Sequence, residues 1–134
     1  MTIKKKAGVV VWRPAKDGGI EMLLITARSF PQSWIFPSGT WEPGETLQQT
    51  AARECAEESG YTVEVGPRLG ELDLVKNSGK IHRITYFAAR QVGELADYEA
   101  DRQRKWVLQT ELDRHVAEVF AAITRAAMQQ QLAG

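Results

Sequence analysis

Residues 39–60, which read GTWEPGETLQQTAARECAEESG, contain the signals that decide the fold. Thr46 and Gln49 have the spacing of a capping box, in which the two side chains bond each other's backbone N–H groups. Gly60 suits the left-handed backbone position that commonly ends a helix. The stretch therefore predicts a helix over 46–59, entered through a loop that contains two glycines.

Three glutamates crowd the C-terminal end of this predicted helix: Glu54, Glu57 and Glu58. Like charges one turn apart destabilise a helix by roughly 0.2–0.5 kcal/mol, and acids in the last turn oppose the helix dipole by roughly 0.3–1 kcal/mol each. Glu54 and Glu58 follow one stripe at the border of the core-facing side, so they also lose hydration. We expect Arg53 to offset part of this cost by pairing with Glu57 or Glu45.

A divalent cation would relieve all of these costs. Mg²⁺ prefers oxygen ligands, takes one or two carboxylates, and completes its shell with water and substrate phosphates. The competing interpretation is a solvated acidic helix face, which is the usual meaning of a charge run. The unfavourable end of the helix, its capped start and its glycine-rich entry favour the metal site.

The rest of the chain predicts an α/β architecture. Short apolar, often β-branched runs indicate strands at 7–12, 20–27, 34–36, 62–65, 69–75, 81–89 and 105–108. Apolar residues at helical spacing predict a second helix over 110–132, with a break near His115 as an alternative. This order of strands and helices predicts a mixed sheet with helices packed on its faces.

Composition restricts the class of protein and its partners. Its 134 residues suit a single domain, residues 1–134, around one core. Seventeen basic residues balance seventeen acidic ones, which argues against a nucleic-acid polymer as partner. Cys55 is the only cysteine, so a reducing compartment is expected. No apolar run approaches the roughly 20 residues of a membrane span, and we therefore expect a soluble, cytoplasmic protein without a membrane partner.

The spacing within the opening stretch resembles the Nudix box. Gly39 is followed after five residues by Glu45 and after seven more by RECAEESGY at 53–61, which matches every polar and glycine position of that motif. Cys55 and Tyr61 stand where a branched aliphatic residue is usual. The resemblance implies the Nudix α/β/α sandwich, a mixed β-sheet between helices, over nearly the whole chain.

The resemblance also implies cleavage of a phosphoanhydride with Mg²⁺ or Mn²⁺. By this resemblance Glu54 and Glu58 are metal ligands, and the backbone carbonyl at Ser38 or Gly39 is a further ligand. Ser38 stands where the family commonly has a glycine. A backbone ligand there therefore requires that the serine adopt the same backbone angles.

Catalytic roles are implied for three charged residues of the box. Glu57 is expected to be the general base for the attacking water, or a further metal ligand through water. Arg53 and Glu45 are expected to form the buried pair that orients the helix. The competing hypothesis is a non-catalytic Nudix-like module that binds a nucleotide, but such modules usually lose box acids that this chain retains.

Residues outside the box carry the substrate prediction. SWIFP at 33–37, HR at 82–83 and RKW at 104–106 look like the diphosphoinositol polyphosphate phosphohydrolases and their diadenosine polyphosphate-cleaving relatives. That resemblance implies basic substrate contacts at Lys5, Lys6, Arg83 and Arg102. A solvated terminus and an exposed strand position are the competing interpretations for the two lysines and Arg83.

We therefore expect a small-molecule polyphosphate substrate, either a diadenosine polyphosphate or a diphosphoinositol polyphosphate. Nucleoside triphosphates and ADP-ribose are the alternatives. Arg28 and Ser29 fall near another substrate contact of that group, although the local order of residues differs. The chain is expected to act as a monomer or homodimer.

Overall fold

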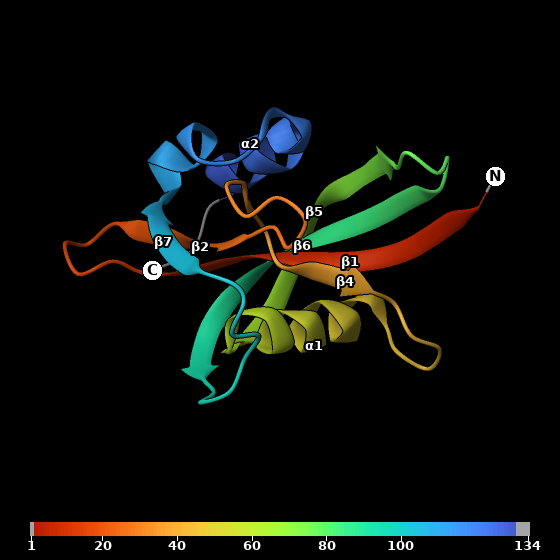
Figure 1. Ribbon diagram of the computed structural model, residues 1–134. Coiled ribbons are helices and arrows are strands. Elements are labelled where there is room, and N and C mark those ends of the chain that lie inside the picture. The colour runs from red at the N-terminus through yellow and green to blue at the C-terminus, as the bar shows by residue number, and fades with distance from the viewer. Residues whose placement is uncertain (1, 131–134) are drawn as a thin grey trace.

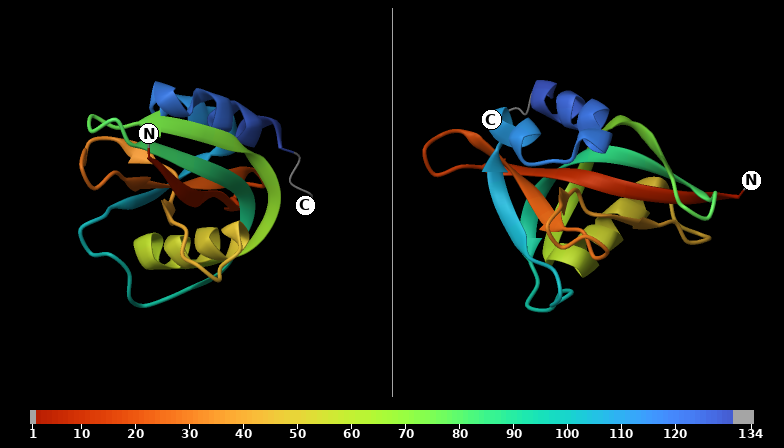
Figure 2. Two further views of the ribbon diagram at one scale, coloured as in Figure 1. Left: turned by 90° about the vertical axis from the view of Figure 1, so that its right-hand side faces the viewer. Right: turned by 45° about the horizontal axis from the view of Figure 1, so that its top comes forward.

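The computed structural model describes residues 2–130 and forms a sheet enclosed between helices. Figures 1 and 2 show α1 and α2 on opposite faces of this sheet, which confirms the predicted three-layer arrangement. The sheet has the strand order β3-β2-β1-β6-β5, with β4 paired to β1 and β7 paired to β2. The elements are β1 (Ile3–Pro14), β2 (Ile20–Thr26), β3 (Trp34–Ile35), β4 (Ser38–Thr40), α1 (Leu47–Ser59), β5 (Tyr61–Val75), β6 (Ile81–Glu94), β7 (Arg104–Leu108), η1 (Gln109–Arg114), η2 (Glu118–Phe120) and α2 (Ala121–Gln129).

Strands β1 and β6 are parallel, while their neighbours pair antiparallel, so the sheet is mixed as predicted. The capping box at Thr46 and Gln49 is formed, and Gly60 ends α1 with a φ of 78°. Ala51 and Cys55 on the inner side of α1 have no exposed surface. They pack against one face of the sheet, where β1 contributes alternate residues to an apolar cluster.

The opposite face of the sheet packs against η1, η2 and α2. Its cluster includes Val10, Phe36, Tyr86 and Phe120, whose aromatic rings meet edge to face at centroid distances of 6.0–6.5 Å. Because side chains alternate along a strand, neighbouring residues of β1 and β6 belong to different faces. This alternation decides which basic residues reach the site described below.

Three predicted elements, two strands and one helix, differ from the structure. The separate strands at 62–65 and 69–75 are one strand, β5, because register shifts on either side of Arg68 accommodate the Gly66-Pro67 pair without ending the strand. The continuous helix over 110–132 is wrong, and the alternative break near His115 is correct. Val116 pairs with Trp34, and Ala117 has a ψ of 149°, which is not helical, so the chain leaves the helical path there. Residues 131–132 of that predicted helix lie outside the described part of the chain.

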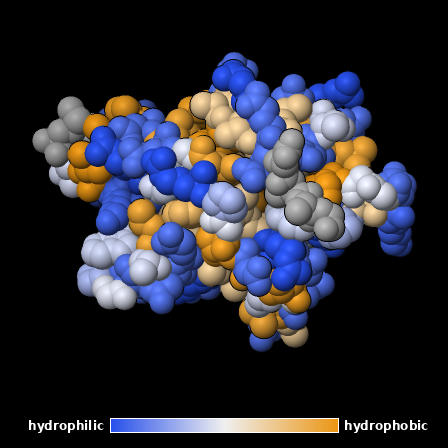
Figure 3. Space-filling view, turned by 180° about the vertical axis from the view of Figure 1, so that it is seen from behind, coloured by the Kyte–Doolittle hydropathy of each residue, from blue (hydrophilic) through white to orange (hydrophobic). Residues whose placement is uncertain are grey.

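None of the helices within residues 2–130 has the length and apolar character needed to cross a membrane. Figure 3, which views the molecule from behind, shows hydrophobic residues interspersed among hydrophilic ones on that face. Exposed large apolar side chains include Phe30 and Val119, which are 68% and 53% exposed.

Candidate active site

The site lies where strands β4 and β2, which pair with different parts of β1, diverge. Lys6–Gly8 of β1 pair with β4, whereas Trp12–Pro14 pair with β2. The C-terminal half of α1 reaches β4 at this point, and the backbone N–H of Ser38 donates to Glu58 Oε1 at 3.0 Å. A Cβ added to Gly39 would overlap the Glu54 carboxyl group, so only glycine lets the two segments approach this closely.

A cavity of about 510 Å³ opens beside these two segments. It brings together six of the residues predicted from the sequence: Lys6, Ser38, Gly39, Glu54, Glu58 and Arg102. Arg28, Lys76 and His82 also line it. The cavity therefore combines two carboxylates with four cationic side chains among the described residues.

Glu58 is the most deeply buried of the acids, with 6% of its surface exposed. Burial, reinforced by the nearby Glu54 charge, raises the pKa of Glu58 to about 8, although Arg102 and the Ser38 N–H favour the ionised form. Arg102 Nη2 lies 3.5 Å from Glu58 Oε2. A cation beside Glu58 would therefore strongly stabilise the ionised form of this carboxyl group.

Glu54 is half-buried one turn before Glu58, and burial also raises its pKa, while Arg53 opposes this shift. Arg53 Nη1 donates to Glu54 Oε1 at 2.8 Å. The Arg53 guanidinium also contacts both oxygens of Glu45, at 2.7 and 3.0 Å, and donates to the Thr40 carbonyl at 3.0 Å. Arg53 thus ties α1 to the loop that precedes it.

The Glu45 carboxylate accepts hydrogen bonds from Arg53, Thr50 and the backbone N–H of Glu42. Hydrogen bonds from Arg53 and then Thr50 lower the pKa of Glu45 to about 2. Glu57 lies on the solvent side of Arg53 at 3.5 Å, and its side chain is 53% exposed. Both pairings expected for Arg53 are therefore present, with Glu45 as the closer partner.

The arrangement fits a hard divalent cation. Residues 2–130 contain no cluster of three or more His, Cys, Asp or Glu side chains arranged to hold a metal, so side chains alone do not complete a site. Mg²⁺ needs only one or two carboxylates when water and phosphate supply the remaining oxygens. Glu54 and Glu58 line one cavity with the backbone of Ser38 and Gly39, and no non-glycine residue in the described range has a positive φ. Ser38 therefore occupies its position without backbone strain.

Lys5 and Arg83, which were predicted to be substrate contacts, do not line this cavity. In the parallel pairing, Lys5 lies opposite Arg83, on the face of the sheet that carries α1. Lys5 lies over the Trp41 ring at 4.8 Å, and Arg83 pairs with Asp73 at 2.9 Å. Lys6 and His82, each one residue away, line the cavity on the other face. Strand alternation thus makes Lys6 and Lys76 the better candidates.

The loop at 95–103 supplies contacts that sequence reasoning missed. Glu99 accepts from Arg102 Nε at 2.7 Å and pairs with Arg28 Nη2 at the same distance. Arg102 also donates to the Thr26 carbonyl at 2.9 Å. No local motif marks Glu99, because its role depends on partners distant in the chain. The result is a chain of charges that runs from Glu58 to Arg28.

The same loop completes the C-terminal end of α1. Helix ends leave carbonyl groups without intrahelical partners. The Glu57 carbonyl accepts from the Glu99 N–H at 3.0 Å, and the Ser59 carbonyl accepts from Arg104 Nη1 at 2.6 Å. The Arg104 guanidinium lies over the rings of Tyr61 and Tyr98, at 4.4 Å from each. These cationic and backbone donors offset the acids at this end of the helix.

Replacing Arg104 with glutamine is expected to lower the free energy of unfolding by about 2 kcal/mol, because a hydrogen bond from a charged group and two ring contacts are lost. Urea denaturation measures this change. Arg90→Gln is the matched control, since the Arg90 side chain is 47% exposed and its ion pair with Glu64 is long, at 3.5 Å. Equal losses in the two variants would contradict a special role for Arg104.

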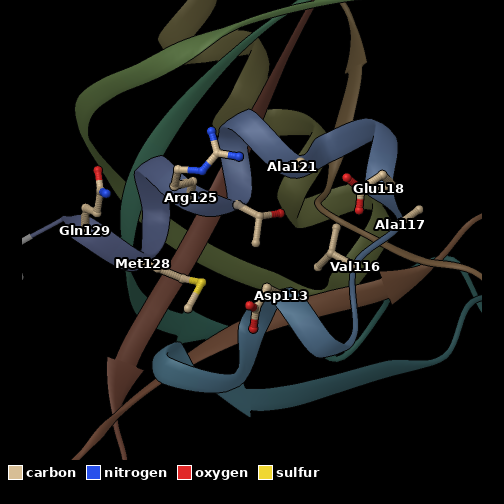
Figure 4. A pocket seen from close by; sticks show the side chains of 9 residues that line it. Asp113, Val116, Ala117, Glu118, Ala121, Arg125, Met128 and Gln129 are labelled. Carbon is tan, nitrogen blue, oxygen red and sulfur yellow. The ribbon is translucent and has the colours of Figure 1, made fainter.

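A second hollow, of about 540 Å³, adjoins the cavity. Figure 4 shows it between α2, which carries Arg125 and Met128, and the segment that carries Asp113 and Glu118. Ala117 lines both spaces. Residues 117–120 are therefore a thin partition, and none of the predicted site residues faces the second hollow.

The site combines the acidic end of α1 with basic side chains in one cavity, and comparisons with known proteins show the family to which the chain belongs. The model of the NUDIX domain matches residues 3–127, so the chain belongs to the Nudix family. Diphosphoinositol polyphosphate phosphohydrolase 3-alpha of Mus musculus is 32% identical over 107 residues, which cover 77% of this chain and 63% of that protein. An 8-oxo-(d)GTP phosphatase of Mycolicibacterium smegmatis is 34% identical over 97 residues, covering 66% of this chain and 30% of that protein.

Among solved structures, the binary complex of a C. elegans Ap4A hydrolase superposes with a TM-score of 0.71 at 25% identity. That match covers 92% of this chain and 93% of the other. By contrast, the chain spans less than two thirds of the length of the mouse relative. The likeness therefore concerns the Nudix domain itself.

Proposed function

We propose that this chain hydrolyses a phosphoanhydride bond in a small nucleoside or inositol polyphosphate, with Mg²⁺ or Mn²⁺ as cofactor. The observation that carries the proposal is the cavity that combines Glu54 and Glu58 with Lys6, Arg28, Lys76 and Arg102. Carboxylates alone would repel a polyphosphate, and cations alone would bind it without chemistry. Their combination suits a charged substrate that is both held and cleaved.

The chain's own residues supply binding and orientation. Glu54, Glu58 and the backbone carbonyl at Ser38 or Gly39 would hold the metal. When bound, such a metal neutralises phosphate charge, orients a water molecule and lowers its pKa. Lys6 and Lys76 provide the positive charge that receives the substrate phosphates, in place of Lys5 and Arg83. Arg102 holds Glu58 and lines the same cavity.

Glu57 is proposed to take the proton of the attacking water, a step that typically contributes about 10²–10⁴-fold. Its exposed carboxylate lies beside Arg53, which holds it close to Glu54. Arg53 and Glu45 position the helix end and have no contact with substrate in this scheme. Catalysis thus depends on α1 remaining fixed to the loop at 38–45.

The names of the related proteins indicate several polyphosphate substrates, which we take as candidates for this chain. They include a diphosphoinositol polyphosphate phosphohydrolase, an Ap4A hydrolase and an 8-oxo-(d)GTP phosphatase. Diadenosine and diphosphoinositol polyphosphates remain our leading candidates, with nucleoside triphosphates and ADP-ribose as alternatives. The cytoplasmic location and the monomeric or homodimeric state also stay predictions.

A substrate panel tests this function. We expect the purified chain to release phosphate or nucleotide from at least one of diadenosine tetraphosphate, a diphosphoinositol polyphosphate, ATP, 8-oxo-dGTP and ADP-ribose. Activity should require Mg²⁺ or Mn²⁺ and disappear with EDTA. Glu57→Gln should reduce turnover by about 10²-fold or more, which also excludes a contaminating enzyme. Binding without hydrolysis across the panel would favour the non-catalytic module instead.

A further inference from the structure

One end of the sheet carries most of the lysines of the chain. There the start of β1 lies beside the turn that joins β5 to β6, at the right of Figure 1, and Ile81 pairs with both Ile3 and Val75. We call residues 2–6 and 74–82 the lysine tip. It has no acidic residue and contains five of the seven lysines of the chain, namely Lys4, Lys5, Lys6, Lys76 and Lys80.

The positive charges of the lysine tip are concentrated in space as well as in sequence. Four of its lysines lie near one imidazole ring, that of His82: Lys6, Lys76, Lys4 and Lys80. Burial and the charges of these lysines lower the pKa of His82 to about 4, so the ring is neutral near pH 7. Because the whole chain is formally neutral, the tip is strongly positive and the rest of the chain carries an equal negative excess.

Substrate binding accounts for only part of this charge. Lys6 and Lys76 line the cavity beside the end of α1, whereas Lys4, Lys5 and Lys80 do not. Lysines near a strand edge also discourage pairing with another sheet. That protective role does not explain why the same tip exposes large apolar side chains.

A row of aliphatic side chains crosses three strands at the lysine tip. Ile81 of β6 lies between Ile3 of β1 and Val75 of β5 in the pairing register, so the three side chains share one face of the sheet. Ile3 is 49% exposed and Val75 is 73% exposed, which makes Val75 the most exposed large apolar side chain within residues 2–130. The tip therefore presents positive charge and apolar surface to the same partner.

This combination matches the surface of an anionic membrane. Anionic headgroups attract lysines, and aliphatic side chains enter the boundary between headgroups and acyl chains. A nucleic acid would also attract the lysines, but single strands are commonly bound by stacking on aromatic side chains, and the tip has no Phe, Tyr or Trp. A symmetric contact with a second copy would bring two lysine clusters together, which their like charges disfavour.

We propose that the lysine tip binds the surface of an anionic lipid bilayer, with Ile3 and Val75 inserted at the interface and the lysines among the headgroups. Attachment of this kind requires no membrane-spanning helix. It differs from the sequence-based expectation of no membrane partner, because that expectation rested on the lack of a spanning segment. Binding at a lipid surface goes beyond the proposed hydrolysis and does not depend on it.

Co-sedimentation of the full chain with lipid vesicles measures this binding. Vesicles of phosphatidylcholine with about 30% phosphatidylserine should bind it about tenfold or more tightly than vesicles of phosphatidylcholine alone. Raising the salt concentration to about 1 M should abolish this difference, because the Debye length falls to about 3 Å. Equal binding to the two kinds of vesicle at low salt, or binding to neither, would overturn the proposal.

Two sets of matched variants locate the binding surface. Lys80→Glu should weaken binding to the anionic vesicles about tenfold. Lys16→Glu, in the exposed turn between β1 and β2, changes the net charge equally and should have no effect. Val75→Ser should weaken binding several-fold, and Val75→Trp should strengthen it, since Trp favours the membrane interface. Val92→Trp, at a residue 51% exposed near the other end of β6, should leave binding unchanged.

Three results would contradict the assignment. Equal losses in Lys80→Glu and Lys16→Glu would show that net charge alone drives binding. Tighter binding of polyuridylic acid than of the anionic vesicles, weakened equally by Lys80→Glu, would assign the lysine tip to a nucleic acid. A dimer that sedimentation velocity detects in the parent chain and not in Val75→Ser would assign the aliphatic row to a second copy.

The Val75 variants also separate membrane binding from catalysis. Val75 pairs with Ile81, the neighbour of the cavity residue His82, so it lies on the face of the sheet opposite the cavity. Turnover of a polyphosphate in solution should therefore be the same in Val75→Ser as in the parent chain. Vesicle binding without hydrolysis would refute the proposed function alone, and hydrolysis without vesicle binding would refute the membrane surface alone.

Discussion

Glu58→Gln is expected to reduce metal-dependent turnover by about 10²–10⁴-fold and, at the same time, to stabilise the metal-free protein at alkaline pH. The loss of activity follows because the amide replaces a carboxylate that we propose as a metal ligand, and such a contribution is worth several kcal/mol. The gain in stability follows because a 6% exposed carboxylate no longer has to ionise inside the protein. The amide oxygen still accepts from the Ser38 N–H.

The sign of the pH effect comes from the raised pKa of Glu58. Its pKa is about 8 in the folded chain, against an ordinary value of 4.5. The folded state therefore holds this proton more tightly, and the associated stability is lost as the pH rises from 4.5 through 8. Glu54, Glu99, Lys6 and Arg102 face the same region and are unchanged in the variant. The difference in unfolding free energy at pH 9 is expected to be on the order of a few kcal/mol.

Thermal unfolding at pH 5 and pH 9, with EDTA and with Mg²⁺, measures this effect. Mg²⁺ should stabilise the parent protein more at pH 9 than at pH 5, because binding requires ionised Glu58, and should stabilise Glu58→Gln little at either pH. Glu64→Gln is the control, since the Glu64 side chain is 71% exposed and its ion pair with Arg90 is long, at 3.5 Å. A variant less stable than the parent at pH 9 without metal would contradict this account of Glu58.

Gly39→Ala is the second change for which we expect a large effect. It should lower catalytic activity strongly and the free energy of unfolding only slightly. The new Cβ would overlap the Glu54 carboxyl group, which must then turn away from the cavity. The end of a glutamate side chain moves easily, so the free energy of unfolding should fall by only about 1 kcal/mol. A displacement of about 1 Å at a reacting centre nevertheless costs about 10²-fold in rate.

Steady-state kinetics and Mg²⁺ titration should therefore show a loss of about 10²-fold in kcat/KM for Gly39→Ala, together with weaker Mg²⁺ binding. Gly19→Ala is the matched control, because a Cβ there meets its nearest neighbours at 3.6 Å, an ordinary contact distance. If Gly39→Ala retained full activity, the close approach of α1 and β4 would have no catalytic importance.

Local spacing was enough to predict α1 and its carboxylates. The capping pair at Thr46 and Gln49, the terminal Gly60 and the acids between them lie within one short segment, so helical periodicity places them without tertiary information. The pairing of Arg53 with Glu45, which the Nudix resemblance implied, is present at 2.7 Å. The acidic part of the site, which we propose to bind the metal, is therefore readable from the sequence.

The basic part of the site, which we propose to bind substrate, was less predictable because it depends on strand register. Lys5 and Lys6 are adjacent in sequence but lie on opposite faces of the sheet, and nothing in KKK indicates which one faces the cavity. Arg28 and Glu99 meet only through the folding of two loops. The prediction of one helix over 110–132 was wrong for a similar reason, because the pairing of Val116 with Trp34 overrides a local apolar pattern.

The alternation along β1 and β6 also constrains how a substrate range can drift during evolution. Substitutions at Lys6 or His82 alter one contact of the cavity at a time, and they leave the opposite face of the sheet unchanged. A single-residue insertion ahead of Lys6 would instead exchange the two faces upstream of it, and a deletion would do the same. Specificity in this domain is therefore open to point mutation but closed to length variation in these two strands. Insertions and deletions that change the substrate range are therefore expected only in the connecting loops, above all at 27–33 and 95–103.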